Sequence, residues 1–197
     1  MRLLLIILPL TFILYACPYE SAVPMEERPV ELIDSSLLGY WYGIVKDGSD
    51  FFGIEALDIS RHSDSVYAIT RYGKAVKGDM VMPDTAYFKG YISRLDGEMY
   101  MNVAGTIVTV TSEKKNKPPV VKTQNIFYIS SISIRHDTLQ VRTITDNFSP
   151  VSRKGFSSSA QLKAEILSMK QQQKNIYDDT YSLSYRKIEK PQPLKPY

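Results

Sequence analysis

Reactive side chains are scarce in this chain of 197 residues, which holds one cysteine and two histidines. A single cysteine excludes an internal disulfide, and so few sulfur and imidazole ligands exclude a cysteine-rich zinc site. The excess of one sign of charge is also small, since 24 basic and 21 acidic side chains leave a net charge of +3. That charge is too small and too evenly spread for a nucleic-acid-binding surface. No glycine-rich phosphate loop occurs in the sequence. We therefore expect no metal, no cofactor and no nucleic-acid partner.

Long apolar runs are missing except at the N-terminus. Residues 3–16 carry no charge, follow Arg2 and contain Pro9. A membrane-spanning helix needs about 20 apolar residues, so this run is too short to cross a bilayer. A positive start, a short apolar run and a small residue, Ala16, before a cleavage point are typical of a secretory signal peptide.

The residues Leu14-Tyr15-Ala16-Cys17 resemble the lipobox of bacterial lipoproteins. The resemblance implies that a signal peptide, residues 1–16, is removed and that Cys17 receives a diacylglycerol and an N-acyl chain. Two or more acyl chains, at ~0.8 kcal/mol per buried methylene, hold a protein firmly on a membrane. Residue 18 is Pro and not the Asp that resembles an inner-membrane retention signal, so we expect the outer membrane, on its periplasmic or cell-surface face. An ordinary signal peptide with a chance cysteine near its cleavage point is the alternative.

The mature chain divides into a tether, one domain and a tail. Residues 17–35 include three prolines and no clear period, which predicts a lipid-anchored tether. Fully extended, such a segment reaches up to ~60 Å from its anchor. Residues 191–197 also hold three prolines and predict an exposed tail. Residues 36–190 remain for a single domain, which is a usual size.

Apolar and polar residues alternate through most of this domain, as Met99, Met101 and Val103 do with Tyr100 and Asn102. A period of two buries one face of a strand and leaves the other in water. Turn signals such as Asp-Gly pairs separate the alternating runs, so we expect antiparallel pairing. The expected strands are 40–46, 53–60, 65–72, 86–93, 98–104, 106–112, 121–135, 138–145 and 180–189.

One helix is expected between the last two strands. Ser158 and Gln161 fit a capping box, in which each side chain satisfies a backbone amide at the helix start. Leu162, Ile166 and Met169 then fall on one helical face. The pattern predicts a helix from about 159 to 174, with Asn175 as its left-handed cap.

Gly39-x-Trp41 stands on the first expected strand and resembles the opening motif of lipocalins. The resemblance implies that Trp41 packs across the closed end of a barrel, with Gly39 beside it and Arg186 of the last strand over the indole ring. It implies an all-β fold, an antiparallel up-and-down β-barrel of about 8–9 strands with one helix before the last strand. The second lipocalin motif, Thr-Asp-Tyr between two middle strands, is missing, so an open two-sheet sandwich is the alternative.

Tyrosine is abundant, with 14 residues, and four of these lie near the middle of expected strands. An inward tyrosine gives a cavity a flat apolar wall and a hydroxyl, a usual composition for a small-molecule site. The candidates for ligand contact are Tyr67, Tyr87, Tyr91 and Tyr128. The alternative is that they pack a core or face solvent.

Candidates for catalysis are few. His62 and His136 each stand beside an acid and a hydroxyl, but both fall in expected hairpin turns, where neighbouring residues do not converge as a triad must. Glu55 and Asp58 interrupt the apolar pattern of the second strand, as an interior carboxyl or a β-bulge would. We expect no catalysis.

Three hypotheses for function remain. The leading one is a lipid-anchored, lipocalin-like outer-membrane protein that binds a small apolar ligand. The second is an accessory interaction subunit of an outer-membrane protein assembly. The third, a hydrolase or isomerase in the same fold, requires His62 or His136 inside a pocket. One barrel fold hosts many functions, so the fold alone does not choose among them.

Overall fold

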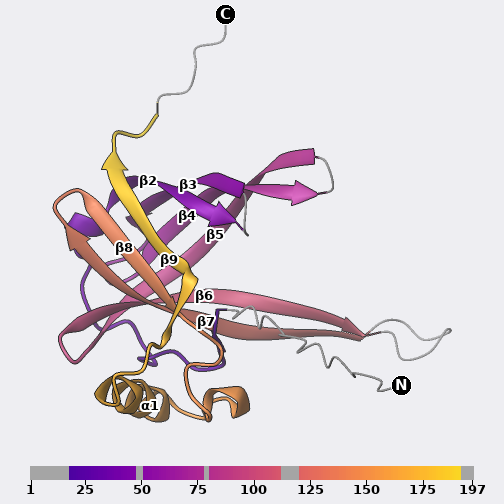
Figure 1. The fold of residues 1–197 in the computed structure, drawn as a ribbon, viewed down its shortest axis with the longest axis vertical. Coiled ribbons are helices and arrows are strands. Elements are labelled where there is room, and N and C mark those ends of the chain that lie inside the picture. Colours follow the sequence, from indigo (N-terminus) through magenta and orange to yellow (C-terminus); the bar gives the residue numbers. More distant parts are fainter. Residues whose placement is uncertain (1–17, 48–50, 78–79, 112–119, 192–197) are drawn as a thin grey trace, which may run out of the picture.

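The computed structural model describes residues 18–47, 51–77, 80–111 and 120–191, and most of them form one closed sheet (Figure 1). Sequential strands pair antiparallel, and the last strand pairs with the first of the ring, so the eight strands β2–β9 form an up-and-down barrel. One helix, α1 (Ser159–Gln171), precedes the last strand. This architecture is lipocalin-like, and it rules out the open sandwich. The strands are β2 (Gly39–Asp47), β3 (Phe51–Arg61), β4 (Tyr67–Lys77), β5 (Met80–Leu95), β6 (Glu98–Thr111), β7 (Val120–Arg135), β8 (Thr138–Ile144) and β9 (Tyr177–Ile188).

β5 and β6 differ most from the predicted strands. β6 is continuous through Gly105, which pairs with Ile126 of β7, where a break was predicted. β5 begins at Met80 and includes Pro83, although a strand from residue 86 was predicted. Proline is tolerated there because this half of β5 pairs only with β4, so no partner needs the missing N–H.

The ring is closed over only part of its height. β5 and β6 pair only from Lys89 to Leu95, and β2 and β9 only from Tyr40 to Tyr42. Beyond these pairs the chain separates into a β2–β5 arm and a β6–β7 arm, which project from the ring (Figure 1). The barrel therefore has one closed end and one end at which its wall is divided.

Trp41 fills the closed end. It is fully buried, and its Nε1–H donates to the carbonyl of Leu37 at 2.9 Å. Gly39 has a φ of +128°, and a Cβ there would lie 3.0 Å from Cε of Lys187, so this position requires glycine. The cation over the indole is Lys187, whose Nζ lies 5.1 Å from the ring centroid. The prediction of Arg186 was wrong by one residue, because side chains alternate along β9 and exposed Arg186 points the other way.

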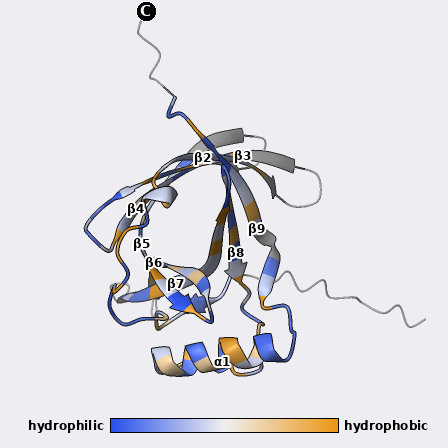
Figure 2. Ribbon diagram, turned by 90° about the vertical axis from the view of Figure 1, so that its left-hand side faces the viewer, coloured by the Kyte–Doolittle hydropathy of each residue, from blue (hydrophilic) through white to orange (hydrophobic). Residues whose placement is uncertain are grey.

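Two hydrophobic cores share the barrel wall. The inner core includes Trp41, Ile92 and Met101, while the outer core joins Tyr100 and Ile129 to the helix. Figure 2 shows α1 outside the ring of strands. Its apolar face is the one predicted: Leu162, Ile166 and Met169. Within the described residues, no helix has the length and apolar character needed to cross a bilayer.

The helix ends differ slightly from the prediction. Ser158 Oγ accepts from the amide of Gln161, as a capping box requires, but Gln161 Oε1 accepts from the amide of Ser157 instead of Ser158. The helix ends at Gln171, and the left-handed residue after it is Gln173, not Asn175. The cap therefore fixes the start of the helix, and the end lies a few residues earlier than predicted.

The N-terminal segment, residues 18–38, packs against the barrel, although a free tether was predicted for residues 17–35. Its first part, β1 (Glu20–Ser21), extends the sheet beside β7. Met25 is fully buried, and its amide donates to Oδ1 of Asn102 at 2.8 Å. Glu26 forms an ion pair with Lys163 of α1, also at 2.8 Å. Buried contacts thus hold the segment over the outer face of the barrel.

Asn102→Ala should loosen this segment. The change leaves the buried Met25 amide without its acceptor, which costs ~1–3 kcal/mol. We expect a loss of that size in the free energy of unfolding in urea, and faster cleavage by the glutamate-specific protease Glu-C after exposed Glu27. Asn125→Ala, at an exposed position on β7, is the matched control. Equal cleavage rates in the two variants would show that Asn102 does not fasten the segment.

Candidate functional site

A cavity of about 970 Å³ lies inside the barrel. Alternate residues of the strands face inward, and most of those that reach the cavity are apolar. Its volume is at the upper end of the range for small-molecule sites, roughly 300–1,000 Å³. The apolar lining consists of Leu37, Leu57, Ile59, Ile69, Phe88, Met101, Val103, Ile132, Leu139, Val141 and Leu183.

Gly43 lets an aromatic ring of the last strand enter the cavity wall. A Cβ at Gly43 would lie 2.8 Å from Cδ1 of Tyr185 and 2.9 Å from the carbonyl of Ser184. Because the second contact is with backbone, a side chain here would push β9 away from β2. Glycine therefore allows Tyr185 to lie across the inner face of β2.

A charged cluster interrupts the apolar lining. Tyr185 donates to Oε1 of Glu55 at 2.5 Å, and Arg71 Nη1 lies 3.7 Å from Oε2 of Glu55. Arg71 also contacts Oδ2 of Asp84 through Nη2 at 2.7 Å. Burial, followed by the charge and hydrogen bond of Glu55, raises the pKa of Tyr185, so its hydroxyl stays a donor. One guanidinium and two carboxylates give this cluster a formal charge of −1.

The structure distinguishes the two carboxylates that sequence analysis singled out on this strand. Glu55 is an interior carboxyl, with its side chain 12% exposed, and the β2–β3 register runs past it without a bulge. Asp58 has the opposite parity and pairs with Lys190 at the surface. The signal for an interior charge was present in the sequence, but Arg71 and Tyr185, its partners, were not identified.

One hydrogen-bond donor of Arg71, its Nε–H, is unpaired among the described residues. The Nε atom is buried. A buried donor without a partner costs about 1–3 kcal/mol, so an acceptor on a bound molecule would be stabilising here. Arg71 lines the cavity, so a water molecule or a ligand there would supply that acceptor.

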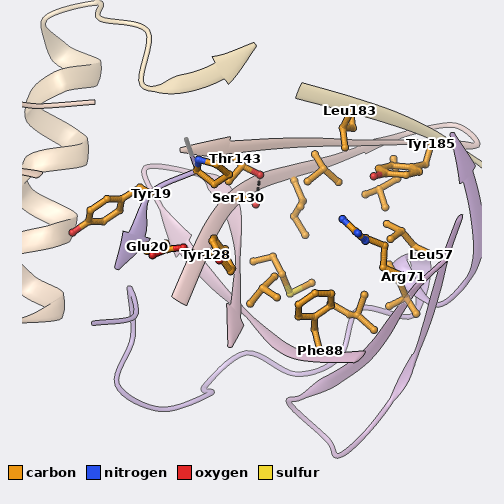
Figure 3. Close-up of a pocket in the computed structure, with 18 of the residues that line it drawn as sticks. Tyr19, Glu20, Leu57, Arg71, Phe88, Tyr128, Ser130, Thr143, Leu183 and Tyr185 are labelled. Carbon is orange, nitrogen blue, oxygen red and sulfur yellow. Dashed lines mark hydrogen bonds between the residues drawn. The ribbon is translucent and has the colours of Figure 1, made fainter. Parts of the chain in front are cut away.

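The other end of the cavity is lined by hydroxyl groups and by the start of the N-terminal segment. Ser130 Oγ and Thr143 Oγ1 are hydrogen-bonded at 2.9 Å, and Tyr128 donates to Oε1 of Glu20 at 3.1 Å. Figure 3 shows Glu20 and Tyr128 at this end, opposite Arg71. The remaining residues of this rim are Pro18, Tyr19, Asp146, Ser152 and Arg153.

The four candidate tyrosines occupy different places. Tyr128 lines the cavity. Tyr67 is buried at the closed end, where its hydroxyl accepts from the amide of Asp34. Tyr91 packs under the N-terminal segment and donates to the carbonyl of Glu26, and burial together with the Glu26 charge raises its pKa to about 12. Tyr87 is 79% exposed. Tyr87 and Tyr91 lie outside the cavity because Phe88 and Ile92 define the inner face of β5.

Both histidines lie in exposed turns at the closed end, as expected, and neither lines the cavity. His136 takes a left-handed conformation with a φ of 57°. In the part of the chain that the structure describes, no three His, Cys, Asp or Glu side chains gather as metal ligands do.

A second hollow, of about 490 Å³, lies where β5 and β6 separate. It shares Ile69 and Phe88 with the lining of the main cavity. The exposed ring of Tyr87 stands at this hollow. The divided wall thus gives the barrel interior a lateral recess.

No protein-family model matches the sequence, and neither the curated proteins nor the solved structures searched contain a match. The lipocalin-like description therefore depends on strand order, barrel closure and the position of the helix.

Proposed function

We propose that this protein is a lipid-anchored outer-membrane lipoprotein whose barrel binds a small, largely apolar ligand without catalysis. The observation that supports the binding role best is the cavity of about 970 Å³, lined mainly by aliphatic and aromatic side chains. Burying apolar ligand surface against such a wall yields about 25 cal/mol per Å². The few polar groups, at Arg71 and at the Ser130–Thr143 pair, would orient the ligand.

The anchor is inferred from the sequence. Cys17 lies outside the described residues, so the support is the lipobox-like tetrapeptide after an uncharged run of signal-peptide length. The absence of catalysis is likewise part of the proposal. It is supported by the two histidines, which lie at exposed turns remote from the cavity lining.

Native mass spectrometry of the mature protein, gently extracted from its own membrane, tests the binding role. We expect the protein to carry the added mass of one small molecule, which organic solvent releases. A protein with no bound molecule, and with an interior filled by its own side chains in an experimental structure, would contradict it.

The second candidate is an accessory subunit of an outer-membrane assembly. The exposed apolar side chains on the arms favour it: Ile44 and Ile54, cross-strand partners, are 66% and 48% exposed. On the other arm, Val108 and Val121 are each 59% exposed. Purification in mild detergent separates the candidates, since a stoichiometric partner lost on Ile44→Ser with Ile54→Ser would favour the subunit, and a lone monomer would oppose it.

A further inference from the structure

The chain is fixed to the barrel from its first described residue. Pro18 forms a β-bridge with Thr145, and the amide of Tyr19 donates to the carbonyl of Ile144 at 2.8 Å. The Tyr19 ring is 5% exposed and packs edge-on against Phe148 and Phe156, with centroids 5.4 and 6.0 Å away. No flexible spacer therefore separates Pro18 from the folded domain.

The same residues form the rim of the cavity. Pro18, Tyr19 and Glu20 all line it, and Glu20 accepts the hydrogen bond of Tyr128. In Figure 3, Tyr19 and Glu20 stand at one end of the cavity, with Leu57 and Arg71 at the other. Since consecutive Cα atoms lie about 3.8 Å apart, Cys17 is one residue spacing from this rim.

We infer that the anchor sets the cavity against the bilayer, so that the ligand passes between membrane and barrel without crossing bulk water. The inference depends on the proposed lipid at Cys17 and on the proposed apolar ligand. Acyl chains on Cys17 must lie in the hydrocarbon layer, and Pro18 then holds the cavity rim at the membrane surface. Val151, the sequence neighbour of the rim residue Ser152, is 44% exposed.

The charges around Arg71 define the head of the ligand. Glu55 and Asp84 already face the guanidinium, so an anionic ligand head, as a third anion, would meet a net negative cluster. The free donor, Nε of Arg71, suits an uncharged oxygen such as an ester carbonyl or a hydroxyl. The ligand class is thus a membrane-resident acyl compound with an uncharged head, such as an acylglycerol.

A spacer at the anchor tests the inference. We would insert about twelve Gly and Ser residues, roughly 20 Å as a flexible coil, between Cys17 and Pro18. The control has the same insertion after Pro191, in the C-terminal tail. Both lipidated proteins sit in phosphatidylcholine vesicles that contain a quencher lipid and an acylglycerol with a fluorophore on its acyl chain. Fluorescence appears when the probe enters the barrel.

The N-terminal spacer should slow probe uptake roughly tenfold, because effective concentration falls with linker length, while the tail insertion changes nothing. Affinity for the probe in solution, measured on unlipidated Cys17→Ala proteins, should be equal with and without the spacer. Equal uptake rates in membranes would overturn the inference and leave ligand binding intact. Failure of every protein to bind the probe would instead remove the proposed function.

Two further comparisons belong to this experiment: the lipidated protein against Cys17→Ala, and a fatty acid against the acylglycerol. If the Cys17→Ala protein binds the probe but the lipidated protein does not, the protein's own acyl chain fills the cavity, and exchange with the membrane is refuted. A fatty acid of equal chain length should bind the Cys17→Ala protein at least tenfold more weakly than the acylglycerol. Tighter binding of the fatty acid would overturn the assignment of an uncharged head.

Discussion

Filling the cavity from its own walls should abolish ligand binding. Val103 on β6 and Val141 on β8 both line it and are half-buried, so Val103→Trp with Val141→Trp places two indole rings in the space a ligand would occupy. We expect the affinity for an uncharged fluorescent probe, N-phenyl-naphthylamine, to fall at least tenfold, equivalent to about 1.4 kcal/mol.

The matched control for this variant is Val108→Trp. Val108 is on the same strand, β6, but has the opposite parity and is 59% exposed, so its indole would face solvent. Circular dichroism and thermal unfolding confirm that each variant is folded before its affinity is compared. Undiminished probe affinity in a folded double variant would show that the probe binds elsewhere.

Trp41→Ala should cause the largest loss of stability. The side chain is fully buried in the inner core, and replacing a buried Trp or Phe by Ala costs ~3–5 kcal/mol. Because domains are stable by only about 5–15 kcal/mol, the loss takes a large share of the total. Urea denaturation followed by far-ultraviolet circular dichroism measures it, since Trp41 is the only tryptophan and its fluorescence disappears with it.

Two variants separate the contributions at this end of the barrel. Trp41→Phe keeps an aromatic ring but loses the hydrogen bond to Leu37, so its loss should be smaller than that of Trp41→Ala. Lys187→Met removes the cation over the ring, worth ~0.5–1 kcal/mol at an exposed site. A Trp41→Ala protein within about 1 kcal/mol of the wild type would mean that this residue does not close the barrel.

Local pattern in the sequence predicted much of the barrel and of its helix. Met99, Met101 and Val103 occupy alternate positions of β6 because one face of this strand lines the barrel interior. The alternation alone predicted that face. On β5, Gly90 stands at an inward position and weakens the pattern, so the inner face of Phe88 and Ile92 was not recognised. Tyr87 and Tyr91 were therefore chosen as ligand contacts although they have the outward parity.

The sequence pattern did not predict contacts between residues that are far apart in the chain. Met25 and Asn102 are 77 positions apart, and nothing in a proline-rich stretch marks one methionine for burial. The pairing of Tyr185 with Glu55 joins the last strand to the second strand of the ring. Arg186 and Lys187 are both basic, so only the register of β9 decides which one covers Trp41. In each case the contact depends on how distant segments are placed in the folded barrel, which local sequence pattern does not encode.

Metabolic labelling with palmitate tests the central claim most directly, because both the anchor and the position of the cavity depend on Cys17. Cells that express the full chain and cells that express Cys17→Ser should be labelled in parallel. The account predicts label in the wild-type protein and none in the variant. An unlabelled wild-type protein would contradict it.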